Sequence, residues 1–67
     1  MVGLGQKLKD ARKAKGLSQQ RVADILRIHR TTYTKYETDA AEPSLETVWA
    51  LMQVLDFSIE EWMQEKA

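Results

Sequence analysis

The segment from residue 30 to residue 35 is rich in side chains that can form hydrogen bonds with nucleic-acid bases. These side chains are Arg30, Thr31, Thr34 and Lys35. Their spacings of one, three and four residues place them on one face of a helix. Arginine can pair with guanine, lysine can reach guanine or phosphate, and threonine offers a hydroxyl and a methyl group for contact with thymine. This composition predicts contact with base pairs in the major groove of DNA. An ordinary solvated helix face is the alternative.

The opposite face of the same helix is predicted to pack against the preceding helix. Tyr33, Tyr36 and Glu37 recur at helical spacing on that side. Ser18 can cap a helix that begins at Gln19 and lasts about eight residues. Two short helices joined by a turn of about three residues pack at a steep angle, so the helix at about 29–37 is expected to project from the molecule.

With three further helices, the sequence predicts that residues 1–67 form a single all-α domain. The first is expected from about Gly5 to Lys15, ended by Gly16 in a left-handed conformation. A fourth begins after Pro43 and Ser44 and carries an apolar face. Ser58 and Glu61 form a capping box for the last helix. The apolar residues expected on these two helices are Leu45, Val48, Leu51, Met52, Leu55, Ile59, Trp62 and Met63.

Charge is strongly divided along the chain, although the net charge is zero. Residues 1–36 contain nine basic and two acidic side chains, and residues 37–67 contain one basic and eight acidic side chains. The resulting dipolar molecule has an electropositive region that can attract a polyanion. Chance segregation in a short chain is the alternative explanation.

Composition argues against catalytic, metal-binding and membrane-spanning functions. The chain has no cysteine and a single histidine, His29, so neither a thiol nucleophile nor a metal cluster is expected. The longest uncharged stretch of the apolar second half, residues 47–55, is nine residues long, which is too short to cross a bilayer. We therefore expect a cytoplasmic protein with no enzymatic activity and no cofactor.

Several motifs resemble the phage-repressor and Cro-like helix-turn-helix family, also called the xenobiotic-response-element (XRE) type. The resemblance covers about residues 5–63. It rests on Leu17-Ser18-Gln19-Gln20-Arg21-Val22-Ala23 through Lys35-Tyr36-Glu37, on Glu42-Pro43-Ser44-Leu45-Glu46-Thr47 and on Ser58-Ile59-Glu60-Glu61-Trp62. It implies a compact five-helix, lambda-repressor-like fold. It also implies a transcriptional regulator, with repression as the expected activity, that binds double-stranded DNA as a homodimer on a near-palindromic operator.

The resemblance also implies roles for individual residues. Base reading falls to Arg30, Thr31 and Lys35, with Thr34 as a further candidate. Gln19, at the start of its helix, is expected to bind a phosphate. Arg12 and Glu37 are expected to form a partly buried ion pair. The basic and polar residues expected to contact the DNA backbone are Lys9, Lys13, Gln19, Arg21, Arg27 and His29.

Four positions depart from the family pattern. Arg27 and Asp39 stand where the family usually has glycine. A left-handed arginine is costly, so either the turn at Arg27 is strained or its geometry differs, whereas aspartate tolerates that conformation better. His29 replaces the usual hydroxyl cap of the helix at about 29–37, and it is either a phosphate contact or a surface residue without a special role. Arg21 stands where an acidic residue is usual, which removes a capping box and adds positive charge.

The last two helices carry more apolar side chains than a core of this size can bury. The excess predicts a homodimer interface, since two half-sites about 34 Å apart require two copies. The residues assigned to it are Trp49, Met52, Phe57, Ile59, Trp62 and Met63. A core that absorbs both tryptophans is one alternative. The other is an antitoxin-like or adaptor protein whose last two helices bind a protein partner.

Overall fold

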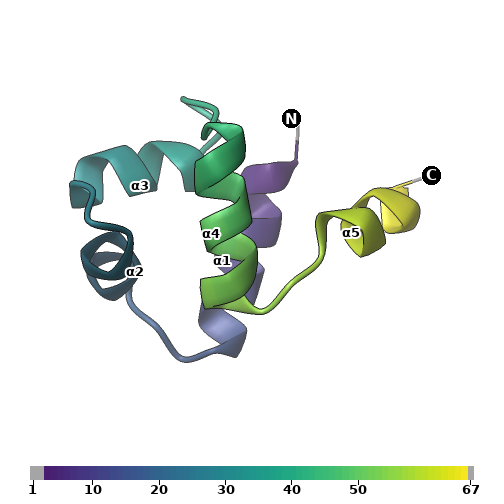
Figure 1. The fold of residues 1–67 in the computed structure, drawn as a ribbon, viewed down its shortest axis with the longest axis horizontal. Coiled ribbons are helices and arrows are strands. Elements are labelled where there is room, and N and C mark those ends of the chain that lie inside the picture. Colours follow the sequence, from purple (N-terminus) through teal and green to yellow (C-terminus); the bar gives the residue numbers. More distant parts are fainter. Residues whose placement is uncertain (1–2, 67) are drawn as a thin grey trace.

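The computed structural model describes residues 3–66, without the side chains of Trp62, Glu65 and Lys66. Every regular element in this range is helical, which confirms the all-α prediction. The helices are α1 (Leu4–Ala14), α2 (Gln19–Leu26), α3 (Arg30–Glu37), α4 (Leu45–Leu55) and α5 (Ile59–Lys66) (Figure 1).

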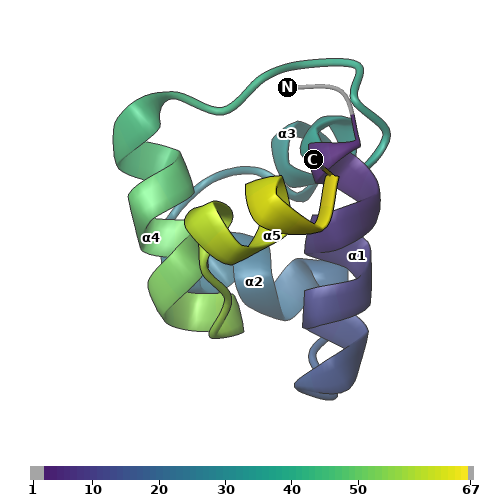
Figure 2. The ribbon, with the colours of Figure 1, turned by 90° about the vertical axis from the view of Figure 1, so that its right-hand side faces the viewer.

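The core lies where α1, α2, α3 and α4 meet. Its largest buried side chains include Leu8, Tyr33 and Leu51, which come from three different helices. Helix α5 lies on the other side of α1 and α4 from α2 and α3 (Figure 1). Figure 2 shows α5 in front of the body, with α4 and α1 to its two sides. Its connection to the core includes the partly buried Phe57 and Ile59. Helix α3 therefore packs against the core, whereas α5 lies at the periphery.

The predicted helix caps are present. Ser18 Oγ accepts a hydrogen bond from the Arg21 backbone N–H at 3.0 Å, and Ser44 Oγ accepts one from that of Thr47 at 3.2 Å. Of the capping box predicted for α5, one half is present: Ser58 Oγ accepts from the Glu61 N–H at 3.4 Å, and no return bond from the Glu61 side chain to the Ser58 N–H occurs within the described residues. Helix α1 begins and ends one residue earlier than predicted, and Gly16 follows it with a φ of 70°. The local start and stop signals were thus interpreted correctly.

Two turns keep the left-handed geometry for which the family uses glycine. Arg27 has a φ of 59° and Asp39 a φ of 61°. The left-handed conformation of Arg27 costs on the order of 1 kcal/mol. The turn at Arg27 is therefore strained rather than altered, whereas Asp39 is of a residue type that tolerates this conformation. His29 is the N-cap of α3 and makes no side-chain capping bond, as its residue type predicted.

The apolar surface of α4 and α5 differs from the prediction in part. Leu45 was expected on the apolar face of α4, three residues before the buried Val48, but it is 86% exposed. The spacing was misleading because the first turn of α4 has no covering helix at this position. Trp49 and Met63 are also exposed, whereas Met52, Phe57 and Ile59 are only half-buried. The Trp62 side chain lies outside the described residues.

None of the helices in residues 3–66 combines the length and the apolar character needed to cross a membrane.

Candidate nucleic-acid interface

The four predicted base-reading residues surround one shallow hollow on the surface of α3. Arg30, Thr31 and Lys35 are exposed, and Thr34 is half-buried. Together these four side chains line a depression of about 410 Å³. The hollow therefore brings donors from arginine and lysine together with two threonine hydroxyls on one rigid helix.

The inward face of α3 is held by two tyrosines. Tyr33 is fully buried, and its ring meets that of Tyr36 edge-on, with 6.5 Å between the ring centroids. The Tyr33 hydroxyl is buried and makes no hydrogen bond within residues 3–66. Burial, followed by the nearby Glu37 carboxylate, raises the pKa of Tyr33, so this phenol stays neutral. Aromatic packing thus fixes which face of α3 points outward.

A close backbone contact at Gly5, which the sequence did not suggest, sets the position of α3 against α1. A Cβ atom at Gly5 would collide with the backbone of Glu37 and would lie 2.8 Å from the Tyr36 carbonyl oxygen. Only glycine allows the first turn of α1 to approach the end of α3 this closely.

Asp39 adds a hydrogen bond at the same place. Its Oδ1 accepts from the backbone N–H of Gly5 at 3.1 Å. The N–H groups of a first helical turn have no partner within the helix, and a negative charge there is favoured by the helix dipole. Asp39, which departs from the family glycine, therefore caps α1 from a distance of 34 residues along the chain.

The expected ion pair between Arg12 and Glu37 is present beneath α3. Arg12 Nε donates to Glu37 Oε2 at 2.6 Å, and Arg12 Nη1 donates to the Leu17 carbonyl at 2.8 Å. Burial by itself would raise the pKa of Glu37, but hydrogen bonds that include those from Arg12 and Gln19 outweigh it and lower the pKa. Glu37 is therefore an ionised, acceptor-only group that ties α1 to α3.

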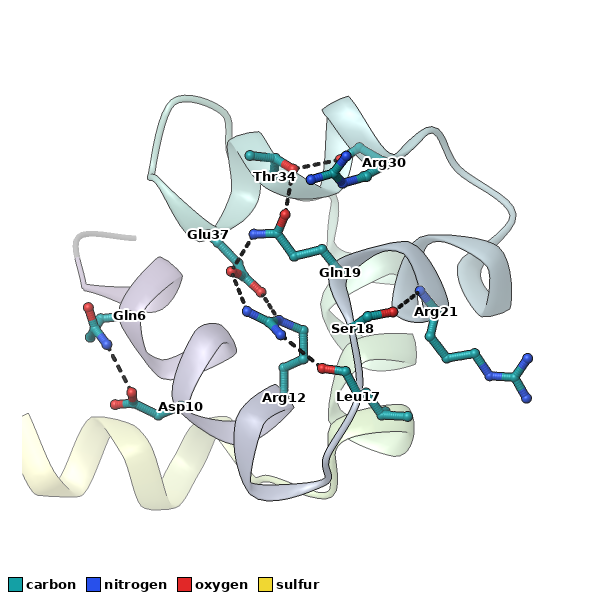
Figure 3. A network of polar contacts seen from close by, with 10 residues as sticks. All are labelled: Gln6, Asp10, Arg12, Leu17, Ser18, Gln19, Arg21, Arg30, Thr34 and Glu37. Carbon is teal, nitrogen blue, oxygen red and sulfur yellow. Dashed lines mark hydrogen bonds and ion pairs between the residues drawn. The ribbon is translucent and has the colours of Figure 1, made fainter.

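Gln19 takes part in the same network, a role that the sequence did not suggest. Its Nε2 donates to Glu37 Oε1 at 3.0 Å, and its Oε1 lies 3.2 Å from the Thr34 hydroxyl (Figure 3). The side chain predicted to bind phosphate thus connects the Arg12–Glu37 ion pair to Thr34 on α3. One amide hydrogen of Gln19 remains for an outside acceptor.

The other predicted phosphate-binding residues are exposed and come from three separate places. Lys9 and Lys13 lie on α1, Arg21 on α2, and Arg27 and His29 in the turn before α3. Figure 3 shows the Arg21 side chain extending away from the Glu37 network. Their side chains make no hydrogen bond or ion pair within the described part of the chain. No cluster of three or more metal-binding side chains occurs there either.

Comparison with known proteins identifies the family to which this arrangement belongs. A family model described as "Helix-turn-helix" matches residues 8–62, which includes α2, α3 and the turn between them. The chain belongs to the XRE-type helix-turn-helix family. This family consists of DNA-binding transcriptional regulators rather than enzymes, in agreement with the sequence prediction.

Two curated relatives from Bacillus subtilis (strain 168) share this region. The SPbeta prophage-derived uncharacterized HTH-type transcriptional regulator YonR is 50% identical over 54 residues, which cover 81% of this chain and 50% of YonR. The uncharacterized HTH-type transcriptional regulator YqaE is 42% identical over 55 residues, which cover 82% of this chain and 47% of YqaE. The chain thus spans about half the length of these relatives. No solved structure matches it.

Proposed function

We propose that this chain reads a specific DNA sequence through the hollow on α3 and acts as a transcriptional repressor. The observation that supports the proposal is the exposure of Arg30, Thr31 and Lys35 on a helix fixed by the core. A projecting helix fits the width of the major groove, where each base pair shows a distinct pattern of donors and acceptors. Positive charge in the first half of the chain would supply backbone affinity.

Arg30 provides the sharpest test of base reading. Purified protein is used to select duplexes from a random pool, and the affinity of Arg30→Ala is then measured on the selected site and on unrelated DNA. A lost guanine contact costs about 1–3 kcal/mol on the selected site and little on unrelated DNA. Equal losses on both would make Arg30 a phosphate contact and refute the assignment.

The salt dependence of DNA binding separates the contribution of contacts with the phosphate backbone from that of contacts with bases. Binding through several phosphate contacts weakens steeply between about 50 and 200 mM salt. The slope is that of the logarithm of the DNA affinity plotted against the logarithm of the salt concentration. Lys9→Ala and Arg21→Ala should each reduce the size of this salt slope by about 1 without altering the selected sequence. An unchanged slope in both variants would remove these residues from the interface.

We also propose that two copies associate through the exposed apolar surface of α4 and α5. A groove of about 400 Å³ is lined by Pro43, Leu45, Val48, Trp49, Met52 and Ile59. The molecule is 32 Å along its longest axis, so one copy covers a single half-site when two half-sites lie about 34 Å apart. A symmetric dimer would bury the groove and present two α3 helices to a near-palindromic operator.

Sedimentation of Trp49→Glu tests the dimer. Trp49 is 63% exposed, so the charge should leave the fold intact but abolish association. Ile25→Glu, at an exposed apolar residue of α2, is the matched control and should still dimerise. A wild-type protein that is monomeric at all concentrations and on operator DNA would contradict the proposal. In that case the groove would favour the second candidate function, an antitoxin-like or adaptor protein that binds a different protein.

A cytoplasmic location follows from the proposed role, because the operator lies on intracellular DNA.

A further inference from the structure

The Thr34 hydroxyl differs from the other groups of the hollow because its hydrogen is committed inside the protein. Its oxygen lies 3.2 Å from Gln19 Oε1 and 2.9 Å from the Arg30 carbonyl oxygen. Both neighbours are acceptors when the Gln19 amide is oriented as in the structure. A hydroxyl has one hydrogen and two lone pairs, so whichever neighbour receives the hydrogen, only lone pairs remain for the outside.

The orientation of the Gln19 amide follows from Glu37. An ionised carboxylate can only accept hydrogen bonds, so the amide nitrogen of Gln19 must face Glu37, 3.0 Å away. Reversing the amide would place two oxygens against each other. The Gln19 carbonyl oxygen therefore faces Thr34, and the buried Arg12–Glu37 pair sets the hydrogen-bonding direction of a residue in the hollow (Figure 3).

Thr34 is thus the acceptor beside two donors. Arg30 and Lys35, which line the same hollow, can only donate hydrogen bonds. Thr31 makes no side-chain hydrogen bond within residues 3–66, so its hydroxyl can turn to donate or to accept.

We propose, on the basis of the base-reading role proposed above, that Thr34 reads an exocyclic amine, that of cytosine N4 or adenine N6. These amines are the only hydrogen-bond donors that bases show in the major groove, whereas guanine and the thymine O4 atom present acceptors. A hydroxyl that offers only lone pairs discriminates between these two groups. Thr34 is thereby a specificity-determining residue whose preference is set from within the protein.

The test compares Thr34→Val with Thr34→Ser on the selected duplex and on all its single base-pair variants. Valine keeps the shape and a methyl group but removes the acceptor, whereas serine keeps the hydroxyl. The wild type and Thr34→Ser should prefer one base pair at one position of each half-site, and that preference should depend on the adenine or cytosine amine of the pair. In Thr34→Val the ratio of affinities for the preferred and the other base pairs should fall by about 2- to 10-fold at that position alone, which corresponds to the loss of a single net hydrogen bond. Thr31→Val is the matched control and should leave this position unchanged.

Base analogues isolate the amine itself. Purine in place of adenine, or pyrimidin-2-one in place of cytosine, removes the amine while retaining the ring. The wild type should lose the same 2- to 10-fold, and Thr34→Val should lose nothing further.

The outcomes separate this inference from the proposed function. If the pool yields no enriched sequence, base reading itself fails and the inference fails with it. If a sequence is enriched and depends on Arg30, two results overturn the inference alone. Either Thr34→Val changes no position, or the base pair whose preference it changes binds the wild type equally well when the exocyclic amine of that pair is removed.

Discussion

At the scale of single residues, Arg27 combines a strained backbone with an exposed positive charge. Its φ of 59° is a conformation that glycine adopts freely and arginine does not. The conformation is needed because the Ile28 N–H reaches the Ala23 carbonyl at 3.0 Å to close the end of α2. An exposed arginine in this strained turn is understandable if its charge is used in binding.

Replacing Arg27 with glycine should separate the two effects. Arg27→Gly is expected to stabilise the fold by about 0.5–1 kcal/mol, because relief of strain exceeds the added entropy of the unfolded chain. The same variant should reduce the salt slope of DNA binding by about 1. Thermal unfolding and titrations at several salt concentrations measure the two quantities. Arg27→Ala is the control, since it loses the charge but keeps the strain; a similar gain in its stability would contradict the explanation.

At the scale of helices, the contact of α1 with α3 fixes the position of α3 in the molecule. Gly5 lies within α1, where alanine would ordinarily stabilise a helix by about 1 kcal/mol. Because a Cβ there meets backbone rather than a flexible side chain, Gly5→Ala should instead destabilise the fold by about 1–3 kcal/mol. Urea unfolding measures the change, and stabilisation would contradict the proposed close packing.

Gly16 is the matched control for this experiment. It has a φ of 70° but open space around it, so Gly16→Ala should cost about 1 kcal/mol through backbone strain alone. Gly16→Asn should recover part of that loss, because asparagine tolerates the left-handed conformation. No such recovery is expected for Gly5→Asn.

The helices also show which features a sequence can predict. Caps at Ser18 and Ser44 and the stop at Gly16 depend on residues within one turn, so local signals were sufficient. The bridge formed by Gln19 and the cap that Asp39 provides for Gly5 join residues 15 to 34 positions apart. Such contacts depend on how helices cross, which helical periodicity does not specify. Leu45 illustrates the same limit, because periodicity indicates a face of a helix but not whether another element covers it.

At the scale of the whole molecule, the Glu37 network links stability to pH. The pKa of Glu37 is lowered from its ordinary value of 4.5, chiefly because Arg12 and other hydrogen-bond donors outweigh the effect of burial. The unfolded chain therefore binds a proton more readily than the folded one. The stabilisation is complete above the unfolded value and is lost as the pH falls through 4.5 towards the folded value.

Acid unfolding should show this dependence. The free energy of unfolding, measured by urea titration from pH 7 to pH 3, should decrease most steeply below about pH 4.5. Glu60→Gln, an exposed change on α5, should retain the wild-type profile. Glu37→Gln should be less stable at pH 7 and show a shallower decrease. An identical slope in wild type and Glu37→Gln would exclude this carboxylate as the source.

The Thr34 side chain is hydrogen-bonded within the protein, unlike the other three side chains of the hollow in the part of the chain that the structure describes. This difference matters for any attempt to change the DNA sequence that the domain recognises. The side chains of Arg30, Thr31 and Lys35 make no hydrogen bond within the described residues, so a combinatorial library at these three positions should alter the recognised sequence while sparing the fold. Position 34 is different, since its side chain contacts Gln19 and, through it, Glu37. A redesign that needs a donor there would have to change positions 19 and 34 as a pair.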